Sequence, residues 1–161
     1  MEDLSLHILD IVENSVKAEA REIRIVIAED TEGDRLSLEI HDDGKGMDET
    51  TRRKALDPFF TTRTTRRFGL GLPLLAEAAR QSGGSLELDS APGRGTIVTV
   101  DFQISHPDRK PLGDIASTLG TILAGRPELD LAFEYRRDGA VVDSLDTRKP
   151  RDAGRERSDQ P

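Results

Sequence analysis

His41-Asp42-Asp43-Gly44-Lys45-Gly46-Met47 is the stretch that organises this chain of 161 residues. It follows an alternating run of apolar residues over 36–40, which predicts a strand with one buried face. Two carboxylates end the strand, and two glycines follow with one residue between them. Because glycine has no Cβ, its backbone can come very close to a flat ligand, and an aspartate here can accept a hydrogen bond from an exocyclic amine such as that of adenine. Taken alone, the stretch is more typical of a tight turn, since Asp-Gly is a common turn dipeptide.

Length and composition limit the classes of protein to consider. The chain is long enough for one ordinary domain with a core, and it has no cysteine, which excludes disulfides and thiolate metal sites. It has no apolar run long enough to span a bilayer and no signal peptide at its start, so we expect a cytoplasmic protein without a membrane partner. The net charge of −8 argues against a nucleic-acid partner. An Mg²⁺-bound nucleotide is compatible with such a surface if a few arginines line its pocket.

Hydrophobic periodicity predicts helices and antiparallel hairpins along the chain. The expected helices cover 3–18, 48–56, 70–82 and 112–124, and the expected strands cover 22–29, 35–42, 85–90, 96–104, 129–136 and 140–145. Hairpins and helices that do not alternate as strand–helix units indicate an α+β fold rather than a Rossmann-like one. Residues 146–161 contain no large apolar side chain and are predicted to be a disordered tail.

The expected first helix carries a polar stripe. Asp10 and Asn14 are four residues apart, so they lie one turn from each other on one face of a helix. A carboxylate and an amide in this arrangement could face a cation. The alternative, which the pattern by itself favours, is a polar outer stripe on a half-buried helix.

Residues 57–67 break the helical pattern. Pro58 halts the preceding helix, and Phe59 and Phe60 follow it. The segment 61–67 then supplies four hydroxyls and three guanidiniums, which could wrap a polyphosphate with charge-assisted hydrogen bonds. A solvated surface loop is the alternative, although a plain loop has no need of exposed aromatic side chains.

Glycines before the next expected helix indicate an anion site. Phe68-Gly69-Leu70-Gly71-Leu72-Pro73 leads into that helix, and Gly83 suits its C-terminal cap. Free backbone N–H groups and the positive end of the helix dipole both point at whatever lies before such a helix, which suits a phosphate.

In this order the segments resemble the motifs of the GHKL superfamily, which contains histidine kinases, DNA gyrase, the large heat-shock chaperones and MutL. The matching segments are 10–14 (asparagine box), 42–46 (first glycine box), 57–63 (phenylalanine box of histidine kinases), 69–72 (second glycine box) and 83–96 (last glycine box). Each motif is weak alone, but all five stand in the right order within residues 1–104. The resemblance implies the Bergerat fold, a two-layer α/β sandwich whose mixed, mostly antiparallel sheet carries helices on one face, with ATP between the helices and a lid.

The resemblance also implies a role for each matching residue. Asp42 would accept a hydrogen bond from the adenine amino group, and Thr96 would complete that contact. Gly44 and Gly46 would let the backbone approach the ring, and Asn14 would ligate Mg²⁺. The remaining residues assigned to ATP are Phe60, Thr62, Arg63, Gly69, Leu70, Gly71 and Leu72, with Arg63 on the terminal phosphate and the amides before the helix around the phosphates.

Asp10 and Arg63 are the candidate catalytic residues. Many relatives have Glu at the position of Asp10, where in the ATPases it activates water, and many histidine kinases have Asn. Aspartate is one methylene shorter, so it reaches the attacking water only if the helix sits closer. Relatives that phosphorylate proteins can also carry an acid here, so Asp10 does not separate a hydrolase from a kinase.

Three interpretations of the reaction follow. The first is transfer of the γ-phosphoryl group of Mg-ATP to a partner protein in the manner of a histidine kinase, favoured by the phenylalanine box and a short lid. Only thirteen residues precede Asn14, which leaves no room for a phospho-accepting helical hairpin, so the acceptor is expected on another chain. The second is a non-catalytic nucleotide sensor. The third is an ATP-hydrolysing conformational switch as in gyrase or MutL. Those proteins have a long lid and a transducer domain, and neither is evident in this sequence.

Residues 105–145 lie outside the superfamily pattern. We expect a helix and a hairpin packed on or docked to the domain 1–104, either extending its sheet or forming a docking face. The segment 105–114 resembles small stand-alone bacterial ATP-binding proteins encoded near hydrogenase or NADH-dehydrogenase-type subunits, so a redox-enzyme subunit is one candidate protein partner.

Overall fold

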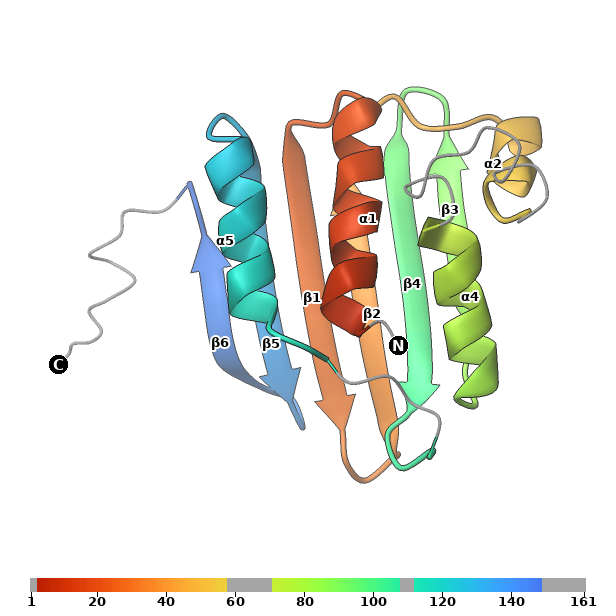
Figure 1. Cartoon of the computed structure of the whole chain (residues 1–161), viewed down its shortest axis with the longest axis vertical. Helices are drawn as coiled ribbons and strands as arrows, with labels where there is room; N and C mark the ends of the chain where they lie inside the picture. Colours follow the sequence, from red (N-terminus) through yellow and green to blue (C-terminus); the bar gives the residue numbers. More distant parts are fainter. Residues whose placement is uncertain (1–2, 58–70, 108–111, 149–161) are drawn as a thin grey trace, which may run out of the picture.

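A computed structural model describes residues 3–57, 71–107 and 112–148 of the chain. Within these ranges the chain forms two layers, a six-stranded sheet and helices over one of its faces (Figure 1). The helices are α1 (Leu4–Lys17), α2 (Glu49–Ala55), α4 (Gly71–Gln81) and α5 (Ile115–Gly125). The strands are β1 (Glu22–Asp30), β2 (Arg35–Asp42), β3 (Leu86–Ala91), β4 (Gly95–Gln103), β5 (Asp130–Arg137) and β6 (Ala140–Asp146). Among the described helices, none has the length and apolar character needed to cross a bilayer.

The strands run in the order β3-β4-β2-β1-β5-β6 across the sheet. Neighbouring strands pair antiparallel except β1 and β5, which pair parallel. The helices α1, α4 and α5 cover one face, and α2 lies near the β3 edge (Figure 1). This arrangement confirms the predicted α+β class with a mixed, mostly antiparallel sheet and helices on one face.

Alternating apolar side chains hold the two layers together. In β1, Ile25 and Ile27 point to the helical face and are at most 1% exposed. Ile8 and Ile11 of α1 belong to the same buried cluster. Full burial of one such side chain contributes about 2 kcal/mol. Packing on the sheet, rather than local helix propensity, therefore keeps α1 in place.

The helix α5 begins three residues later than the periodicity of 112–124 predicted. Gly113 has φ of +79°, which a right-handed helix does not accommodate, and the side chain of Asp114 caps the helix by accepting from the backbone N–H of Ser117 at 3.0 Å. The carbonyl oxygen of Leu112 instead accepts from the backbone N–H of Ser5 at 3.0 Å. Leu112 has the spacing of the apolar stripe of α5, but it ties the approach to this helix to the start of α1.

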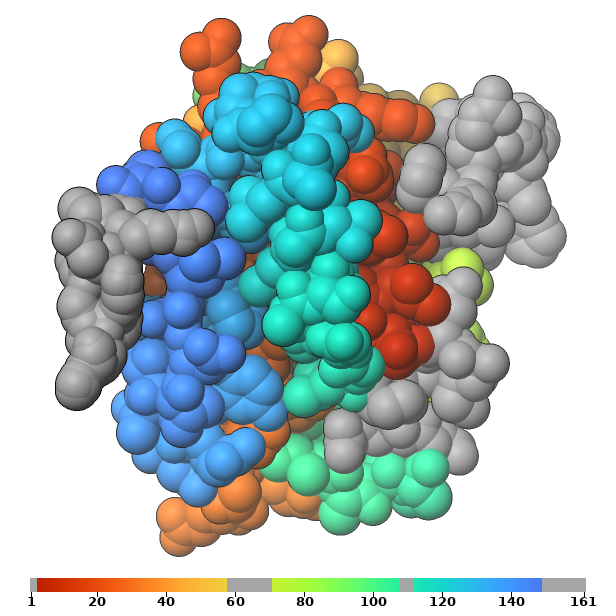
Figure 2. Space-filling view, turned by 60° about the vertical axis from the view of Figure 1, so that its left-hand side comes forward, coloured from red at the N-terminus to blue at the C-terminus, as the bar shows by residue number. Residues whose placement is uncertain are grey.

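The segment from α5 to β6 continues the sheet beyond β1. Ile25 of β1 pairs with Phe133 of β5, and α5 lies beside α1 over the same face (Figure 2). The strand β6 ends one residue later than predicted. Beyond it, the backbone N–H of Thr147 donates to the carbonyl oxygen of Leu131, and the N–H of Leu131 donates to Oγ1 of Thr147, each at 3.0 Å. Residues 149–161 of the predicted tail lie outside the described residues.

Candidate functional site

Asp42 lies at the end of β2, on the side of the sheet that α1 covers. Its carboxylate accepts a hydrogen bond from Oγ of Ser15 in α1 at 2.6 Å and another from the backbone N–H of Gly44 at 2.9 Å. A carboxylate has about four lone-pair positions. The two neutral donors therefore orient Asp42 and leave its oxygens able to accept from a further donor.

The loop after β2 is fastened to the loop between α1 and β1. The backbone N–H of Lys45 donates to the carbonyl oxygen of Ala18 at 2.9 Å, and the carboxylate of Asp43 accepts from the N–H groups of Arg21 and Glu22 at 2.8 and 3.0 Å. Partial burial of Asp43 works to raise the pKa of its carboxyl, but the two N–H groups outweigh it, and this pKa lies below its ordinary value. The protein's own hydrogen bonds therefore set the position of this loop.

Contacts within the protein already require the two glycines of this loop. A Cβ on Gly44 would lie 2.8 Å from the carbonyl oxygen of Ala18. One on Gly46, whose φ is +73°, would lie 2.0 Å from the carbonyl oxygen of Ala91. Any side chain at either position would push the loop away from its neighbours. The expected approach of these two glycines to a flat ligand stays a prediction.

Thr96 in β4 lies beside Asp42, because the two residues pair across β2 and β4. Oγ1 of Thr96 is 2.8 Å from Oγ of Ser90, which accepts from the N–H of Met47 at 2.9 Å and donates to the carbonyl oxygen of Gly95 at 3.0 Å. A serine hydroxyl has one proton, so Thr96 is the donor to Ser90 and its oxygen keeps only acceptor capacity. Asp42 and Thr96 thus present neighbouring acceptors on one face of the sheet.

Asp10 lies on the side of α1 that meets the start of α4, Asn14 lies one turn further along the same helix face, and both residues are partly buried. A Cβ on Gly71, the first residue of α4, would lie 3.0 Å from Cβ of Asp10, so the two helices meet there closely. Asn14 directly precedes Ser15, whose hydroxyl binds Asp42. The polar stripe of α1, the carboxylate at the end of β2 and the first turn of α4 therefore come together.

Several predicted site residues fall in a segment about which the structure says nothing. Phe60, Thr62, Arg63, Gly69 and Leu70 lie outside the described residues. The side chain of Leu72, at 8% exposure, belongs to the apolar core.

Sequence reasoning missed the two serines that hold the acceptors in place. Ser15 is 3% exposed and continues the buried stripe of α1. Because a buried hydroxyl needs a hydrogen-bond partner, a serine at a core position of a helix was a usable signal. Ser90 gives no such signal, because its role depends on the turn that brings Met47 and Thr96 to it.

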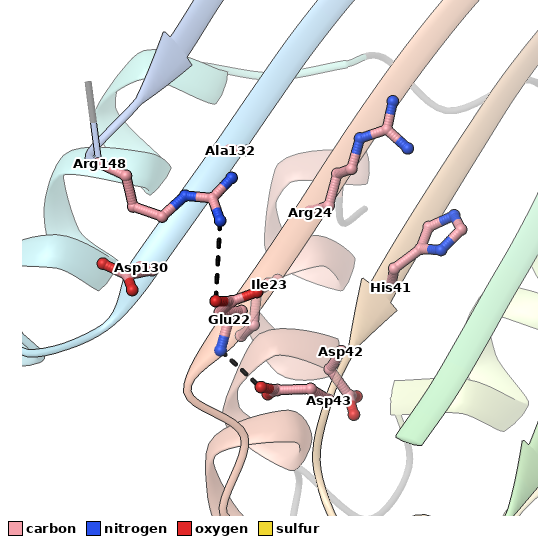
Figure 3. A pocket seen from close by; sticks show the side chains of 9 residues that line it. All are labelled: Glu22, Ile23, Arg24, His41, Asp42, Asp43, Asp130, Ala132 and Arg148. Carbon is pink, nitrogen blue, oxygen red and sulfur yellow. Dashed lines mark hydrogen bonds and ion pairs between the residues drawn. The ribbon is translucent and has the colours of Figure 1, made fainter. Parts of the chain in front are cut away.

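A cleft whose lining also includes Asp42 lies at the same end of β1, β2 and β5 (Figure 3). Its lining residues are Glu22, Ile23, Arg24, His41, Asp42, Asp43, Asp130, Ala132 and Arg148. Arg24 and His41 point from the face of the sheet that lies away from α1 (Figure 3). Arg148 pairs with Glu22 at 3.7 Å, and carboxylates outnumber guanidiniums in the lining. The cleft therefore offers no excess of positive charge for a polyphosphate.

The donor set between α1, β2 and α4 suits an Mg²⁺-bound adenine nucleotide. Asn14 offers an amide oxygen, a ligand type that Mg²⁺ accepts, and Asp10 places a carboxylate one turn away on the same helix. Asp42 and Thr96 supply acceptors for an exocyclic amine. The close contact of Gly71 with Asp10 brings the first turn of α4, with its backbone N–H groups, to the same place.

The chain is similar to known sensor kinases over this region. It is 42% identical to the sensor protein kinase FleS of Pseudomonas aeruginosa over 93 residues, covering 58% of this chain and 23% of FleS. It is 34% identical to the sensor histidine kinase ZraS of Klebsiella oxytoca over 107 residues, covering 66% and 23% of the two chains. It is 33% identical to the nitrogen regulation protein NtrY of Azorhizobium caulinodans over 99 residues, covering 61% and 12%. The chain thus spans less than a quarter of the length of each of these relatives.

Among solved structures, the chain matches a crystal structure of full-length ShkA in complex with AMPPNP. It shares 22% identity with this chain, covers 60% of this chain and 20% of ShkA, and has a TM-score of 0.49.

The segment from α1 to β4 matches a family profile. The family described as histidine kinase-, DNA gyrase B-, and HSP90-like ATPase matches residues 2–106, which include Asp10, Asn14, Asp42 and Thr96. This match covers more than half of the chain and confirms the resemblance that the motifs indicated. The chain therefore belongs to the family of histidine kinase-, DNA gyrase B- and HSP90-like ATPases.

Proposed function

We propose that this protein binds Mg-ATP between α1, the end of β2 and the start of α4, and transfers the γ-phosphoryl group to a partner protein. The observation that carries the proposal is the 2.6 Å hydrogen bond between Ser15 and Asp42. It joins Asp42, whose carboxylate would recognise adenine, to Ser15. Ser15 directly follows Asn14, and Asn14 is the proposed metal ligand. Family membership supports nucleotide binding, and the sensor kinases among the relatives support transfer rather than hydrolysis.

Adenine recognition would rest on the two acceptors at the ends of β2 and β4. The Asp42 carboxylate would accept from the 6-amino group, and the Thr96 oxygen from the same group or a water beside it. Guanine has a carbonyl oxygen at that position, which would face acceptors only. A polar mismatch at a site shielded from water costs roughly 1–3 kcal/mol or more, so we expect ATP to be preferred over GTP.

The phosphates would lie between α1 and α4. The amide oxygen of Asn14 would ligate Mg²⁺, and the first backbone N–H groups of α4 would face phosphate oxygens. Bound ATP supplies the phosphoryl group, whose bond to the bridging oxygen breaks as its bond to the acceptor forms, with ADP leaving. Asp10 would take the proton of the attacking group. Arg63, outside the described residues, stays the candidate for the terminal phosphate.

The acceptor is proposed on another protein because the chain's own histidines are poorly placed. His7 is 3% exposed. His41 points from the far face of the sheet and is 3.0 Å from Glu39 (Figure 3). His106 follows the end of β4 that is opposite to Thr96. Transfer to His41 or His106 within one molecule would require the phosphoryl group to cross the sheet or to reach its opposite end, and His7 is too deeply buried to receive it.

Incubation of the full chain with Mg²⁺ and ATP labelled in the γ-phosphate, alone and with a cell lysate, tests the proposal. We expect the label on a second polypeptide. Release of free labelled phosphate would instead support a hydrolase. Nucleotide binding without transfer or hydrolysis would support a sensor.

Two variants make this experiment specific. Asp10→Asn should retain ATP binding and lose the transfer of label, because it removes the proton acceptor and leaves the adenine contacts. Asp42→Asn should lose both. Transfer at the parent rate by Asp10→Asn would remove Asp10 from the reaction.

A further inference from the structure

Arg126 joins the C-terminal part of the chain to α1. It directly follows α5, which lies along α1 (Figure 2). Its Nη2 donates to Oε1 of Glu13 at 2.8 Å. The pair is partly exposed, with 35% of the Arg126 side chain and 26% of the Glu13 side chain accessible to solvent. Arg126 lies beyond the segment 2–106 that matches the family, so it is a feature of this chain rather than of the matched region.

Asn14 stands between two anchored neighbours. Glu13 is bound by Arg126, and Ser15 is bound to Asp42. Successive helix residues are about 100° apart around the axis, so the two anchors hold α1 from different sides and oppose its rotation. A rotation of α1 by about 10° would displace a side-chain tip by roughly 1 Å if that tip lies about 6 Å from the helix axis. Such a displacement is large for a metal ligand, because coordination tolerates only small errors of position.

Stability alone gives a poor account of Arg126. Its Nε is buried and has no hydrogen-bond partner in the part of the chain that the structure describes. A buried donor without a partner is unfavourable, and a partly exposed ion pair offsets little of that cost. An apolar side chain could fill the space between α1 and α5 without this cost, but it could not orient Glu13.

We propose that Arg126 is a positioning residue, which holds Asn14 in the geometry for Mg²⁺ by fixing Glu13 and with it the rotation of α1. The segment from α5 to β6 thereby takes part in metal-dependent nucleotide binding. This inference rests on the proposed function, because it takes Asn14 as the metal ligand.

The test measures the affinity of the full chain for the non-hydrolysable analogue AMPPNP by calorimetry, once with Mg²⁺ and once with EDTA. Arg126→Gln is expected to weaken binding about tenfold with Mg²⁺ and to leave binding in EDTA unchanged. Arg126→Lys, which keeps the positive charge, should recover part of the loss. Asn14→Ala should remove the whole gain that Mg²⁺ gives to the parent chain.

Arg137→Gln is the matched control. Arg137 of β5 pairs with Glu29 of β1 through Nε and Oε1 at 3.1 Å, at the end of these strands away from Asp42. Its loss also removes an ion pair between the C-terminal segment and the rest of the sheet. We expect AMPPNP affinity to be unchanged in both conditions.

Three results would overturn the inference: equal weakening by Arg126→Gln with Mg²⁺ and in EDTA, the same loss in Arg137→Gln, or no recovery with Arg126→Lys. If Arg126→Gln does not fold, Glu13→Gln removes the same pair from the α1 side and is judged on the same two affinities. A parent chain that binds AMPPNP equally well in both conditions refutes the role of Asn14 and this inference, but not nucleotide binding. A parent chain that binds in neither refutes the proposed function as well.

Discussion

Two aspartates at opposite ends of β2 use their carboxylates in different ways. Asp34, just before the strand, accepts from the backbone N–H of Ser105 at 3.0 Å, from Oγ of Ser105 at 2.7 Å and from Nε2 of Gln103 at 3.0 Å. Asp42, at the other end, accepts from Ser15 and from the N–H of Gly44. The carboxylate of Asp34 uses three hydrogen bonds to hold the start of β2 against the end of β4. The carboxylate of Asp42 is oriented by two donors and can still accept a further hydrogen bond beside α1. The same residue type thus serves structure at one end and is suited to recognition at the other.

Replacing each aspartate by asparagine should separate these roles most strongly. Asp42→Asn turns one acceptor into a donor that would face the adenine amine, so we expect ATP affinity to fall about hundredfold or more. Asp34→Asn should lower the melting temperature and leave ATP affinity unchanged. Calorimetry and thermal unfolding of both variants provide the measurements. Comparable losses of affinity in the two variants would show that Asp42 acts only through the fold.

Removing the serine that holds each carboxylate is the next test. Ser15→Ala deletes the donor that orients Asp42, and we expect ATP affinity to fall about fivefold, the equivalent of about 1 kcal/mol. Ser105→Ala deletes the corresponding donor to Asp34 and should affect thermal stability alone. An unchanged ATP affinity in Ser15→Ala would mean that Asp42 is oriented without Ser15.

Acid should weaken the lock at Asp34. Hydrogen bonds from the side chains of Ser105 and then Gln103 lower the pKa of Asp34. Because the folded-state pKa is depressed, the carboxylate contributes its full stability above the ordinary pKa of about 3.9, and this contribution is lost as the pH falls through the folded-state value. Urea unfolding at a series of pH values should show a smaller acid loss for Asp34→Asn than for the parent chain. Parallel pH profiles would argue against this linkage.

The smallest effect is expected at the C-terminal end of the edge strand β6. A chain ending at Leu145 lacks Thr147, which exchanges two hydrogen bonds with Leu131, and Arg148, which pairs with Glu22. We expect a melting temperature lower by roughly 2–4 °C and an unchanged ATP affinity. A chain ending at Arg148 keeps these contacts and should melt like the parent, so a drop there would give the tail a structural role.

Local patterns in the sequence predicted the elements well and their partners less well. Strands such as β1 and β2 follow from alternation, because one face of each packs on the core. The start of α5 was predicted three residues too early because Leu112 fits the apolar spacing of this helix. Spacing alone gives no information on the positive φ of Gly113. The parallel pairing of β1 with β5 had no local signal, and the sequence left open whether the C-terminal segment extends the sheet or forms a docking face.

The candidate site shows the same division. The motifs selected Asp10, Asn14, Asp42 and Thr96, and the structure brings their positions together around α1, while their roles with ATP stay predictions. The bond from Ser15 to Asp42 joins residues 27 positions apart in the chain. Such a partner is visible only after folding, because no spacing within one helix or strand specifies it. The contact of Arg126 with Glu13 was not predicted for the same reason, because the two residues are 113 positions apart in the chain.

The parallel pairing of β5 with β1 also protects β1 from pairing with other molecules. A polypeptide that stops at residue 106 would lose β5 and expose one side of Glu22–Asp30, a strand with five apolar residues in sequence EIRIVIAED. Its backbone N–H and C=O groups on that side would then be available to pair with the same strand of another molecule, which is a common start of aggregation. The segment after 106 therefore covers the free side of β1. A chain that ends at residue 106 is expected to aggregate more readily than the full chain.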